Sequence, residues 1–355
     1  MPDYSNWLTK LLVLVVESKA SDLHLSVNHP PILRIAGRLI PVPNRPRLTP
    51  EDTQGFAFAL MTDEQRNRFL QEKDIDFSYS LEDLARFRVN IFYQKSTISI
   101  ALRFIPAKIP TIEELNLPPT LKEFTHYSQG FVLVTGPSGQ GKSTTLAALL
   151  DEINHSRPDH IITIEDPIEY VFREDKCIID QREVYQDTKS FARALRSTFR
   201  QDPDVIMVGE MRDLETIATA ITAAETGHLV FATLHTNSAA QTIHRIVDSF
   251  PPIQQSQVRA QLAGSLLGVI SQRLLPRKKG GLIPACEIMF NTPAVANLIR
   301  ENKIHEIPIV IETSAERGMI SLNRSLANLV KAEEVSLEVA LSYSLAPQEL
   351  QRMIK

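Results

Sequence analysis

The stretch Gly136-Pro-Ser-Gly-Gln-Gly-Lys-Ser143 decides the fold of the second half of the chain. It follows the apolar run 131–135 and precedes the helical pattern 144–153, which is the strand, loop and helix context of a phosphate loop. Its glycines let the backbone curl so that N–H groups point at phosphate oxygens, and the helix N-terminus adds favourable partial charge. A tight turn without a ligand is the plainer interpretation, but the complete motif in this context favours nucleotide binding.

Each position of the motif has an expected task. Lys142 is expected to reach the β- and γ-phosphates and to act in catalysis, while the Ser143 hydroxyl completes a Mg²⁺ shell. The motif therefore predicts a nucleotide and Mg²⁺ as cofactors, and the family resemblance described below implies that the nucleotide is ATP. The nucleotide-binding residues expected from the motif are Gly136, Pro137, Ser138, Gly139, Gln140, Gly141, Lys142, Ser143 and Thr144.

Two further apolar runs end in acidic residues. Residues 204–210 begin with Asp204 and end with Glu210. Because ligands gather at the carboxyl ends of strands in open α/β sheets, Glu210 is the better candidate for catalysis and for binding Mg²⁺. Residues 162–169 place three carboxylates after another strand pattern, where one of them can orient the attacking water. Solvated loop acids are the plainer interpretation of that segment.

Histidines and arginines supply further candidates. His228 and His235 bracket an apolar strand pattern, where a structural role is common and a role near the γ-phosphate or at a subunit interface is the alternative. Arg86, Arg88 and Arg103 lie on strand patterns of the first hundred residues. They either pair with acids on the sheet or neutralise the triphosphate, as arginine fingers do.

The apolar runs on either side of the phosphate loop indicate an α/β domain. Runs of continuous hydrophobicity alternate with helical patterns, which is typical of a parallel sheet covered by helices. Beyond Pro251 the pattern predicts mostly helix. The predicted strands of this half are residues 131–135, 161–164, 205–208 and 229–234.

The first hundred residues have a different hydrophobic pattern. Consecutive strand patterns with one helical stretch predict an antiparallel sheet in an α+β domain. A first helix with Leu8, Leu11, Leu12 and Val15 on one face is expected to face the core rather than a membrane surface. The predicted strands are 22–27, 32–42, 74–79, 86–93 and 97–104, and the predicted helix is 49–71.

Length and composition agree with this division. A chain of 355 residues exceeds one ordinary core, and two prolines in 105–110 favour a linker. The predicted domains are 1–105 and 118–355, joined by a linker at 106–117.

A net charge of −4 predicts no nucleic-acid partner. Two isolated cysteines predict no disulfide or zinc site and a reducing cytosol. The apolar run 11–16 is too short for a membrane span.

Several motifs together resemble the secretion ATPases, and among them the PilT-like retraction motors of type IV pili. The resemblance implies a PAS-like first domain, a RecA-like ATPase core and a cytoplasmic homohexamer at the inner membrane, which acts on a pilus platform protein there. Relatives that drive assembly or secretion usually have a longer N-terminal region and a tetracysteine zinc site, so retraction is favoured over them. The motifs are ASDLHLS at 20–26, ARFRVN at 85–90, IEDPIE at 164–169, DPDVIMVGEMRD at 202–213 and TGHLVFATLHT at 226–236.

The resemblance also implies roles for single residues. It matches Glu169 to the catalytic carboxylate of the family's Asp box and Glu210 to its Walker B acid. The remaining matched nucleotide contacts are His228 and His235 of the His box and Arg88 and Arg103 of the first domain. Where many relatives have a further arginine, this chain has Lys95. Two other readings stay open: a nucleotide-gated scaffold with negligible turnover, and a RecA-like nucleic-acid motor.

Overall fold

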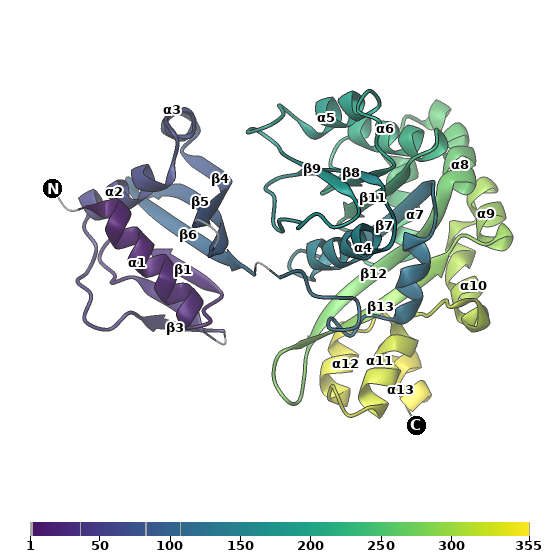
Figure 1. The fold of residues 1–355 in the computed structure, drawn as a ribbon. Coiled ribbons are helices and arrows are strands. Elements are labelled where there is room, and N and C mark those ends of the chain that lie inside the picture. The colour runs from purple at the N-terminus through teal and green to yellow at the C-terminus, as the bar shows by residue number, and fades with distance from the viewer. Residues whose placement is uncertain (1–2, 36, 82–83, 107, 355) are drawn as a thin grey trace. The chain divides into compact units, whose positions relative to one another are not determined.

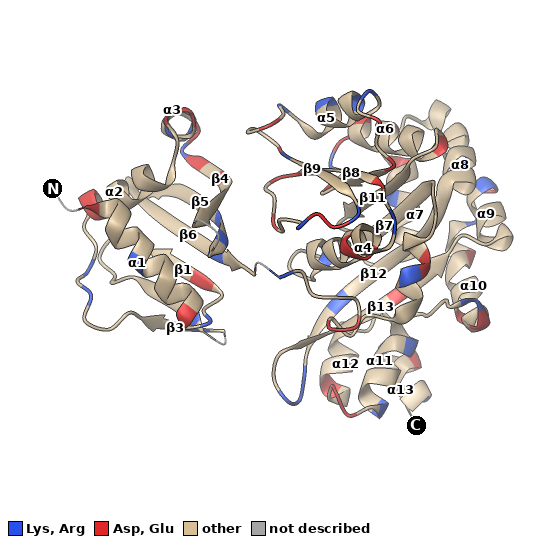
Figure 2. Cartoon of the chain, in the orientation of Figure 1, with Lys and Arg blue, Asp and Glu red and all other residues tan. Residues whose placement is uncertain are grey.

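The chain divides into two compact units in a computed structural model that describes residues 3–35, 37–81, 84–106 and 108–354 (Figure 1). The first unit comprises Met1–Lys108 together with Pro167–Val171. The second comprises Ile109–Asp166 and Phe172–Lys355. Acidic and basic residues are interspersed over both units (Figure 2).

The first unit is a six-stranded sheet in the order β3-β2-β1-β6-β5-β4, packed against helices. All neighbouring strands are antiparallel, which confirms the expected α+β arrangement. The strands are β1 (Asp22–Leu25), β2 (Ile32–Ile35), β3 (Arg38–Pro41), β4 (Asp74–Leu81), β5 (Ala85–Gln94) and β6 (Thr97–Ile105). The helices are α1 (Tyr4–Glu17), α2 (Pro50–Leu60) and α3 (Asp63–Glu72).

Two elements of this unit differ from the sequence expectation. Residues 32–42 form a hairpin instead of one strand, because Gly37 takes a φ of 82° that a strand residue does not adopt. Residues 49–71 form two helices instead of one. Met61 is extended, and Thr62 starts α3 with a capping box in which its side chain and that of Gln65 bond each other's backbone N–H.

Helix α1 faces the core of the first unit, as predicted. Leu8, Leu11, Leu12 and Val15 are all buried in one hydrophobic cluster with the sheet. Their spacing of three and four residues places them on one stripe of the helix.

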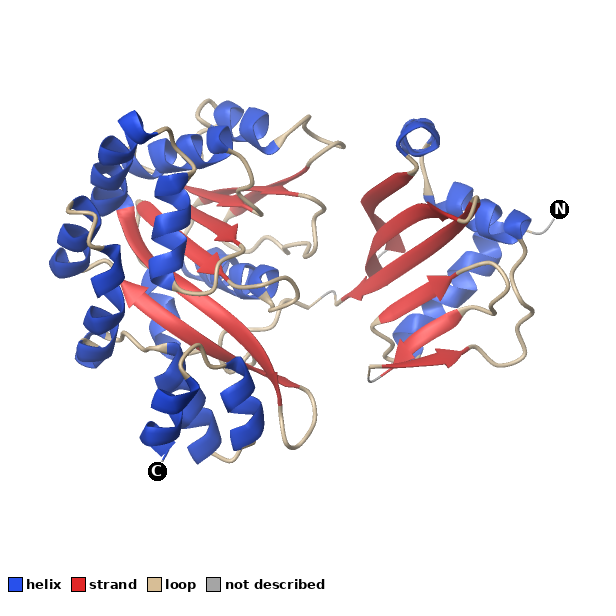
Figure 3. Cartoon of the chain, turned by 180° about the vertical axis from the view of Figure 1, so that it is seen from behind, coloured by secondary structure: helices blue, strands red, loops and turns tan. Residues whose placement is uncertain are grey.

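The second unit is a seven-stranded sheet in the order β13-β12-β7-β11-β10-β8-β9, surrounded by helices (Figure 3). The strands from β12 to β9 run parallel, and β13 is antiparallel to β12. The strands are β7 (Gly130–Thr135), β8 (His160–Glu165), β9 (Ile178–Glu183), β10 (Val205–Val208), β11 (Leu229–Leu234), β12 (Leu266–Pro276) and β13 (Leu282–Phe290).

Helices connect and follow these strands. Every residue of β7, β10 and β11 is buried, which explains why their sequences are continuous apolar runs. The helices are α4 (Lys142–Ser156), α5 (Phe191–Thr198), α6 (Leu214–Glu225), α7 (Ala239–Asp248), α8 (Pro252–Ser265), α9 (Pro293–Arg300), α10 (Ile307–Thr313), α11 (Leu322–Lys331), α12 (Leu337–Tyr343) and α13 (Pro347–Ile354). Among the described residues, none of these helices has the length and apolar content that crossing a bilayer requires.

The expectation of mostly helix beyond Pro251 is wrong for residues 266–290. There β12 and β13 form a long antiparallel hairpin, and β12 also pairs in parallel with β7. Most β12 residues are buried, so its side chains show no alternation between apolar and polar. An apolar run of this kind cannot be told from a buried helix by periodicity alone.

The segment 106–117 contributes to the second unit for most of its length. From Ile109 onward it belongs to that unit, and its Ile112 and Leu117 side chains are buried. Ala107 lies outside the described residues. The domain boundaries drawn from the sequence stay a prediction, because contacts within one chain do not test whether each part folds alone.

Candidate nucleotide-binding site

The phosphate loop connects the central strand β7 to the N-terminus of α4. Gly136, Gly139 and Gly141 have φ angles of 147°, 75° and 78°, which glycine adopts without strain. Gly136 is also confined by its neighbours. A Cβ atom placed there would lie 2.5 Å from the carbonyl oxygen of Gln272 on β12. The loop conformation therefore requires glycine at 136 for two independent reasons.

Lys142 is buried at the first position of α4 and folds back over the loop. Its Nζ donates to the carbonyl oxygens of Gly136 at 2.8 Å and Pro137 at 2.9 Å. The same Nζ lies 3.4 Å from Nδ1 of His235. Because an ammonium group has no acceptor, Nδ1 must accept and the ring proton must sit on Nε2.

His235 also contacts Glu210 through its other ring nitrogen. Its Nε2 lies 3.1 Å from Oε1 of Glu210, so the ring donates to the carboxylate. Arg212 contacts the other carboxylate oxygen at 2.8 Å. Burial acts to raise the pKa of Glu210, but the charge and hydrogen bond of Arg212 and the hydrogen bond from His235 outweigh it and hold that pKa below its ordinary value. Glu210 is thus kept ionised beside the loop.

The topology of the sheet brings these residues together. Strands β7, β11 and β10 are neighbours and parallel, so the residues after their carboxyl ends meet at one edge. Asp204 precedes β10 at the opposite edge, where its Oδ2 accepts from the backbone N–H of His160 at 2.8 Å. The geometry therefore agrees with the choice of Glu210 over Asp204.

Within the chain His228 lies away from this group, and its expected role near the γ-phosphate or at a subunit interface stays a prediction. His228 precedes β11, and a strand of six residues spans roughly 20 Å. Its Nδ1 lies 3.0 Å from the carbonyl oxygen of Ala223, and its ring packs edge-on against Phe199. Within the chain, His228 is held at the far edge of the sheet.

The acids that follow β8 have separate surroundings. Glu165 is buried, and its Oε1 accepts from Thr163 at 2.8 Å and from Gln181 at 3.2 Å, which makes it part of the packed sheet. Glu169 lies in Pro167–Val171, which belongs to the first unit, and its Oε1 is 3.4 Å from NH1 of Arg88. The strand pattern in the sequence did not show that Glu165 is packed in the sheet whereas Glu169 contacts Arg88.

Arg88 and Arg103, the two arginines that the resemblance matches to nucleotide contacts, are paired with acids on the sheet of the first unit. Arg88 also contacts Asp76, with Nε 3.1 Å from Oδ2. Arg103 contacts Asp22, with Nε 3.0 Å from Oδ1, while most of its side chain is exposed. Arg88 and Arg103 are directly opposite each other on β5 and β6. Their contact with nucleotide stays a prediction.

A cavity of about 310 Å³ lies beside the phosphate loop within the second unit. Thr144 of the motif lines it together with apolar side chains of the β12–β13 hairpin, Leu274, Leu282 and Pro284, and with Leu115. Apolar walls with a few polar groups are typical of small-molecule pockets. The sequence analysis missed Leu274, Leu282 and Pro284 because it predicted no strands in residues 266–290.

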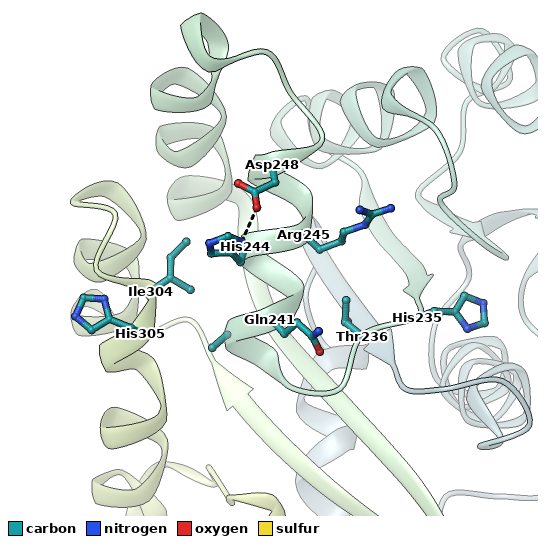
Figure 4. Close-up of a pocket in the computed structure, with 9 residues that line it drawn as sticks. His235, Thr236, Gln241, His244, Arg245, Asp248, Ile304 and His305 are labelled. Atoms are coloured by element: carbon teal, nitrogen blue, oxygen red, sulfur yellow. Dashed lines mark ion pairs between the residues drawn. The ribbon is translucent and has the colours of Figure 1, made fainter. Parts of the chain in front are cut away.

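A larger cavity of about 520 Å³ has His235 and Thr236 at its border (Figure 4). Its walls come mainly from α7, where Nδ1 of His244 is 2.6 Å from Oδ2 of Asp248. His305 lines it from the segment before α10. Most of its polar side chains, including His244, Arg245 and Asp248, are exposed, whereas Thr236 is buried.

The residues at the loop fit a magnesium ion bound together with nucleotide. Ser143 and Glu210 provide hydroxyl and carboxylate oxygens, which Mg²⁺ prefers, and Mg²⁺ usually takes one or two protein ligands plus phosphates and water. Among the described residues, no group of three or more His, Cys, Asp or Glu side chains could hold a metal by itself. Two oxygen ligands next to a phosphate loop agree with that mode of binding.

Comparison with known proteins defines the family. The family model described as type II/IV secretion system protein matches residues 4–333. The chain belongs to this family. It is 47% identical over 341 residues to the type IV pilus retraction ATPase PilT of Pseudomonas aeruginosa, covering 96% of this chain and 99% of that relative. It is also 47% identical over 311 residues to a twitching motility protein of Neisseria gonorrhoeae, covering 87% and 83%.

A solved structure agrees with both the fold and the ligand class. The crystal structure of the pilus retraction motor PilT with bound ADP superposes with a TM-score of 0.90 at 49% identity, covering 97% of this chain and 98% of that one. The second unit therefore has the RecA-like fold of the secretion ATPases, and the chain is a P-loop ATPase. The expected fold class and family are confirmed.

Proposed function

We propose that this chain is the subunit of an ATP-hydrolysing motor that powers retraction of type IV pili. The observation that carries the proposal is the contact series from Lys142 through His235 to Glu210 at the phosphate loop. In this series the His235 ring contacts both the Lys142 ammonium, which is proposed to bind phosphate, and the ionised Glu210 carboxylate. The relatives named as retraction and twitching motility proteins indicate the process that the hydrolysis drives.

Each residue has a defined task in the proposed hydrolysis. Lys142 exchanges the Gly136 and Pro137 carbonyl oxygens for the β- and γ-phosphates, and loop N–H groups bind the same oxygens. Ser143 and Glu210 would hold Mg²⁺, which when bound would neutralise charge on the phosphates. Glu169 orients the attacking water, and His235 keeps Glu210 in place.

The cavity of about 310 Å³ beside Thr144 is the proposed site for the base and ribose. Arg88 and Arg103 are proposed to neutralise phosphate charge from the first unit, where arginine presents several fixed donors. The remaining proposals follow from the family: a homohexamer on the cytoplasmic face of the inner membrane, which associates with the membrane through a pilus platform protein.

Phosphate release by the purified full-length chain tests the proposed activity. Release must exceed that of a Lys142→Ala variant, because removing the ammonium removes a main contact to the transferred phosphoryl group. Equal release from both proteins would support a nucleotide-gated scaffold instead.

Deletion of the gene tests the direction of the motor. Hyperpiliated cells without twitching support retraction, whereas cells without pili indicate a motor for pilus assembly. Re-expression of the Lys142→Ala variant in the deletion strain is the matched control, since it restores the protein without its activity.

A further inference from the structure

Strand β12 lies directly beside β7 and contacts two loops of the site through consecutive residues. Gln272 and Arg273 are 2% and 6% exposed. Since successive strand residues point to opposite faces, their side chains reach different loops. Neither residue belongs to the phosphate loop or to the motifs that identify the family.

Gln272 holds the phosphate loop and the first turn of α4. Its Nε2 donates to the carbonyl oxygen of Gln140 at 2.7 Å, and its Oε1 accepts from Oγ1 of Thr145 at 2.7 Å. The Gln140 side chain makes a second contact with β12, because its Oε1 accepts from the backbone N–H of Leu274 at 2.7 Å. Both ends of the buried Gln272 amide are thus used, and an unpaired partner left behind would be unfavourable.

Arg273 holds the loop that follows β11. Its NH2 donates to the backbone oxygen of Asn237 at 3.1 Å and to Oδ1 of the same residue at 2.9 Å. Its NH1 donates to the carbonyl oxygen of Gln272 at 2.9 Å. Asn237 is two residues beyond His235. The carboxylate of Glu287 on β13 fixes the next turn by accepting from the backbone N–H of Ala239 at 2.7 Å.

We propose that Gln272 and Arg273 are positioning residues for ATP hydrolysis, an inference that rests on the proposed function. Gln272 keeps the phosphate loop in the conformation that binds nucleotide. Arg273 places His235 between Lys142 and Glu210. The distance of 3.4 Å between Lys142 and His235 depends on both loops, and one strand keeps them in register.

The two residues act on different steps, so their variants have different kinetic signatures. Gln272→Met keeps the volume and loses both hydrogen bonds, and we expect the KM for ATP and the Kd for ADP to rise about tenfold with little change in kcat. Arg273→Met releases the His235 loop, and we expect kcat to fall about tenfold with little change in KM. A role in packing alone would not separate KM from kcat in this way.

Steady-state phosphate release against ATP concentration, together with equilibrium binding of fluorescently labelled ADP, measures both quantities on the full chain. Ser271→Ala is the matched control on the same strand. Ser271 is buried, and its Oγ has no hydrogen-bond partner among the described residues, so neither KM nor kcat should change. Melting temperatures without nucleotide report stability separately.

Two further variants test the contacts themselves. Thr145→Val should raise the Kd for ADP, should add little to Gln272→Met in the double variant, and should be rescued by Thr145→Ser, which keeps the hydroxyl. Arg273→Lys keeps a buried charge near Glu287 but cannot hold the three oxygens together, so kcat should be intermediate. It also keeps the test valid if Arg273→Met does not fold.

Unchanged KM and Kd in a folded Gln272→Met variant, or unchanged kcat in a folded Arg273→Lys variant, would overturn the proposal. So would effects that are fully additive between Gln272 and Thr145. Failure of the proposed function looks different: the wild-type chain would release no more phosphate than Lys142→Ala. ADP binding by the Gln272 and Thr145 variants still decides their positioning role in that case.

Discussion

The ammonium group of Lys142 lies 3.4 Å from Nδ1 of His235, whose Nε2 lies 3.1 Å from a carboxylate oxygen of Glu210. The two ring nitrogens therefore have opposite roles. Nδ1 accepts from the residue that binds phosphate, and Nε2 donates to the acid that holds Mg²⁺ in the proposed mechanism. One imidazole thus sets the geometry between the two charged groups.

A substitution that imitates only the Nε2 atom of His235 should separate these roles. In His235→Gln the side-chain amide can still donate to Glu210 from near the Nε2 position, whereas His235→Ala loses both contacts. We expect turnover to fall about tenfold in the Gln variant and about a hundredfold in the Ala variant, as for loss of a positioned polar group. Phosphate release measures this, and His155→Ala, an exposed histidine in the last turn of α4, is the control. Equal losses in both His235 variants would show that the contact to Glu210 is unimportant.

Neutral versions of Glu169 and Glu210, the two proposed catalytic acids, should bind ATP but hydrolyse it poorly. Glu169→Gln and Glu210→Gln keep the side-chain shape and remove the charge, and we expect turnover to fall by a factor of about a hundred or more. Labelled ATP binding and phosphate release measure the two effects. Asp204→Asn, at the opposite edge of the sheet, should keep near-normal turnover. Near-normal turnover in both Glu variants would mean that the catalytic groups are elsewhere.

Loss of the Ser143 hydroxyl should change the dependence on magnesium. Ser143→Ala removes one proposed oxygen ligand, and we expect the Mg²⁺ concentration for half-maximal hydrolysis to rise about tenfold. Binding of labelled ADP in the presence of a chelator should stay close to that of the wild type, because the loop N–H groups remain. If both measurements change in the same proportion, Ser143 acts on the loop conformation and not on the metal.

Two glycines of the loop, Gly136 and Gly139, should differ in their tolerance of alanine. Gly136→Ala combines a positive φ with a Cβ 2.5 Å from the Gln272 oxygen, and we expect it to lower the free energy of unfolding by at least about 2 kcal/mol. Gly139→Ala meets no atom within 4 Å, so only the strain of about 1 kcal/mol remains. Urea unfolding measures both. Gly264→Ala in α8, also in open space, is the helical control and should stabilise by about 0.5 kcal/mol. A Gly139 variant less stable than the Gly136 variant would contradict the contact with β12.

Acid should remove a stabilising contribution of Glu210. Its pKa in the folded chain is held below the ordinary value of 4.5 by Arg212 and His235, against the effect of burial. An acid with a lowered pKa stabilises the fold above its unfolded pKa and loses that contribution as pH falls through the folded pKa. The difference in unfolding free energy between wild type and Glu210→Gln should therefore be constant near neutral pH and shrink below pH 4.5. Urea unfolding over this range measures it, and a difference that grows on acidification would refute the pairing.

Local patterns in the sequence were enough to find the phosphate loop and its flanking elements. The loop depends on short-range features: glycines where φ is positive, a lysine at the first helical position and a buried strand before it. Glu210 was also found, because the end of a parallel strand determines which edge of the sheet its residue occupies. The face of α1 that carries Leu8 and Leu11 followed from helical periodicity in the same way.

The sequence did not predict what depends on contacts between distant residues. Strand β12 was missed, because its pairing with β7 buries it on both faces and removes the alternation that identifies a strand. The contacts that Gln272 of β12 makes with Gln140 and Thr145 were therefore missed too. Gln272 is more than 120 positions from either residue in the chain. The place of His228 at the far edge also became clear only once the direction of β11 was known.

The sequence by itself predicted a phosphate loop at residues 136–143, because backbone conformation there depends on residues adjacent in the chain. Only the tertiary structure decided that Lys142, His235 and Glu210 form one contact series and that β12 holds the loops carrying the first two. Those contacts depend on strand order, since β7 has β11 on one side and β12 on the other. Strand order is set by burial over the whole sheet, and no local pattern encodes it.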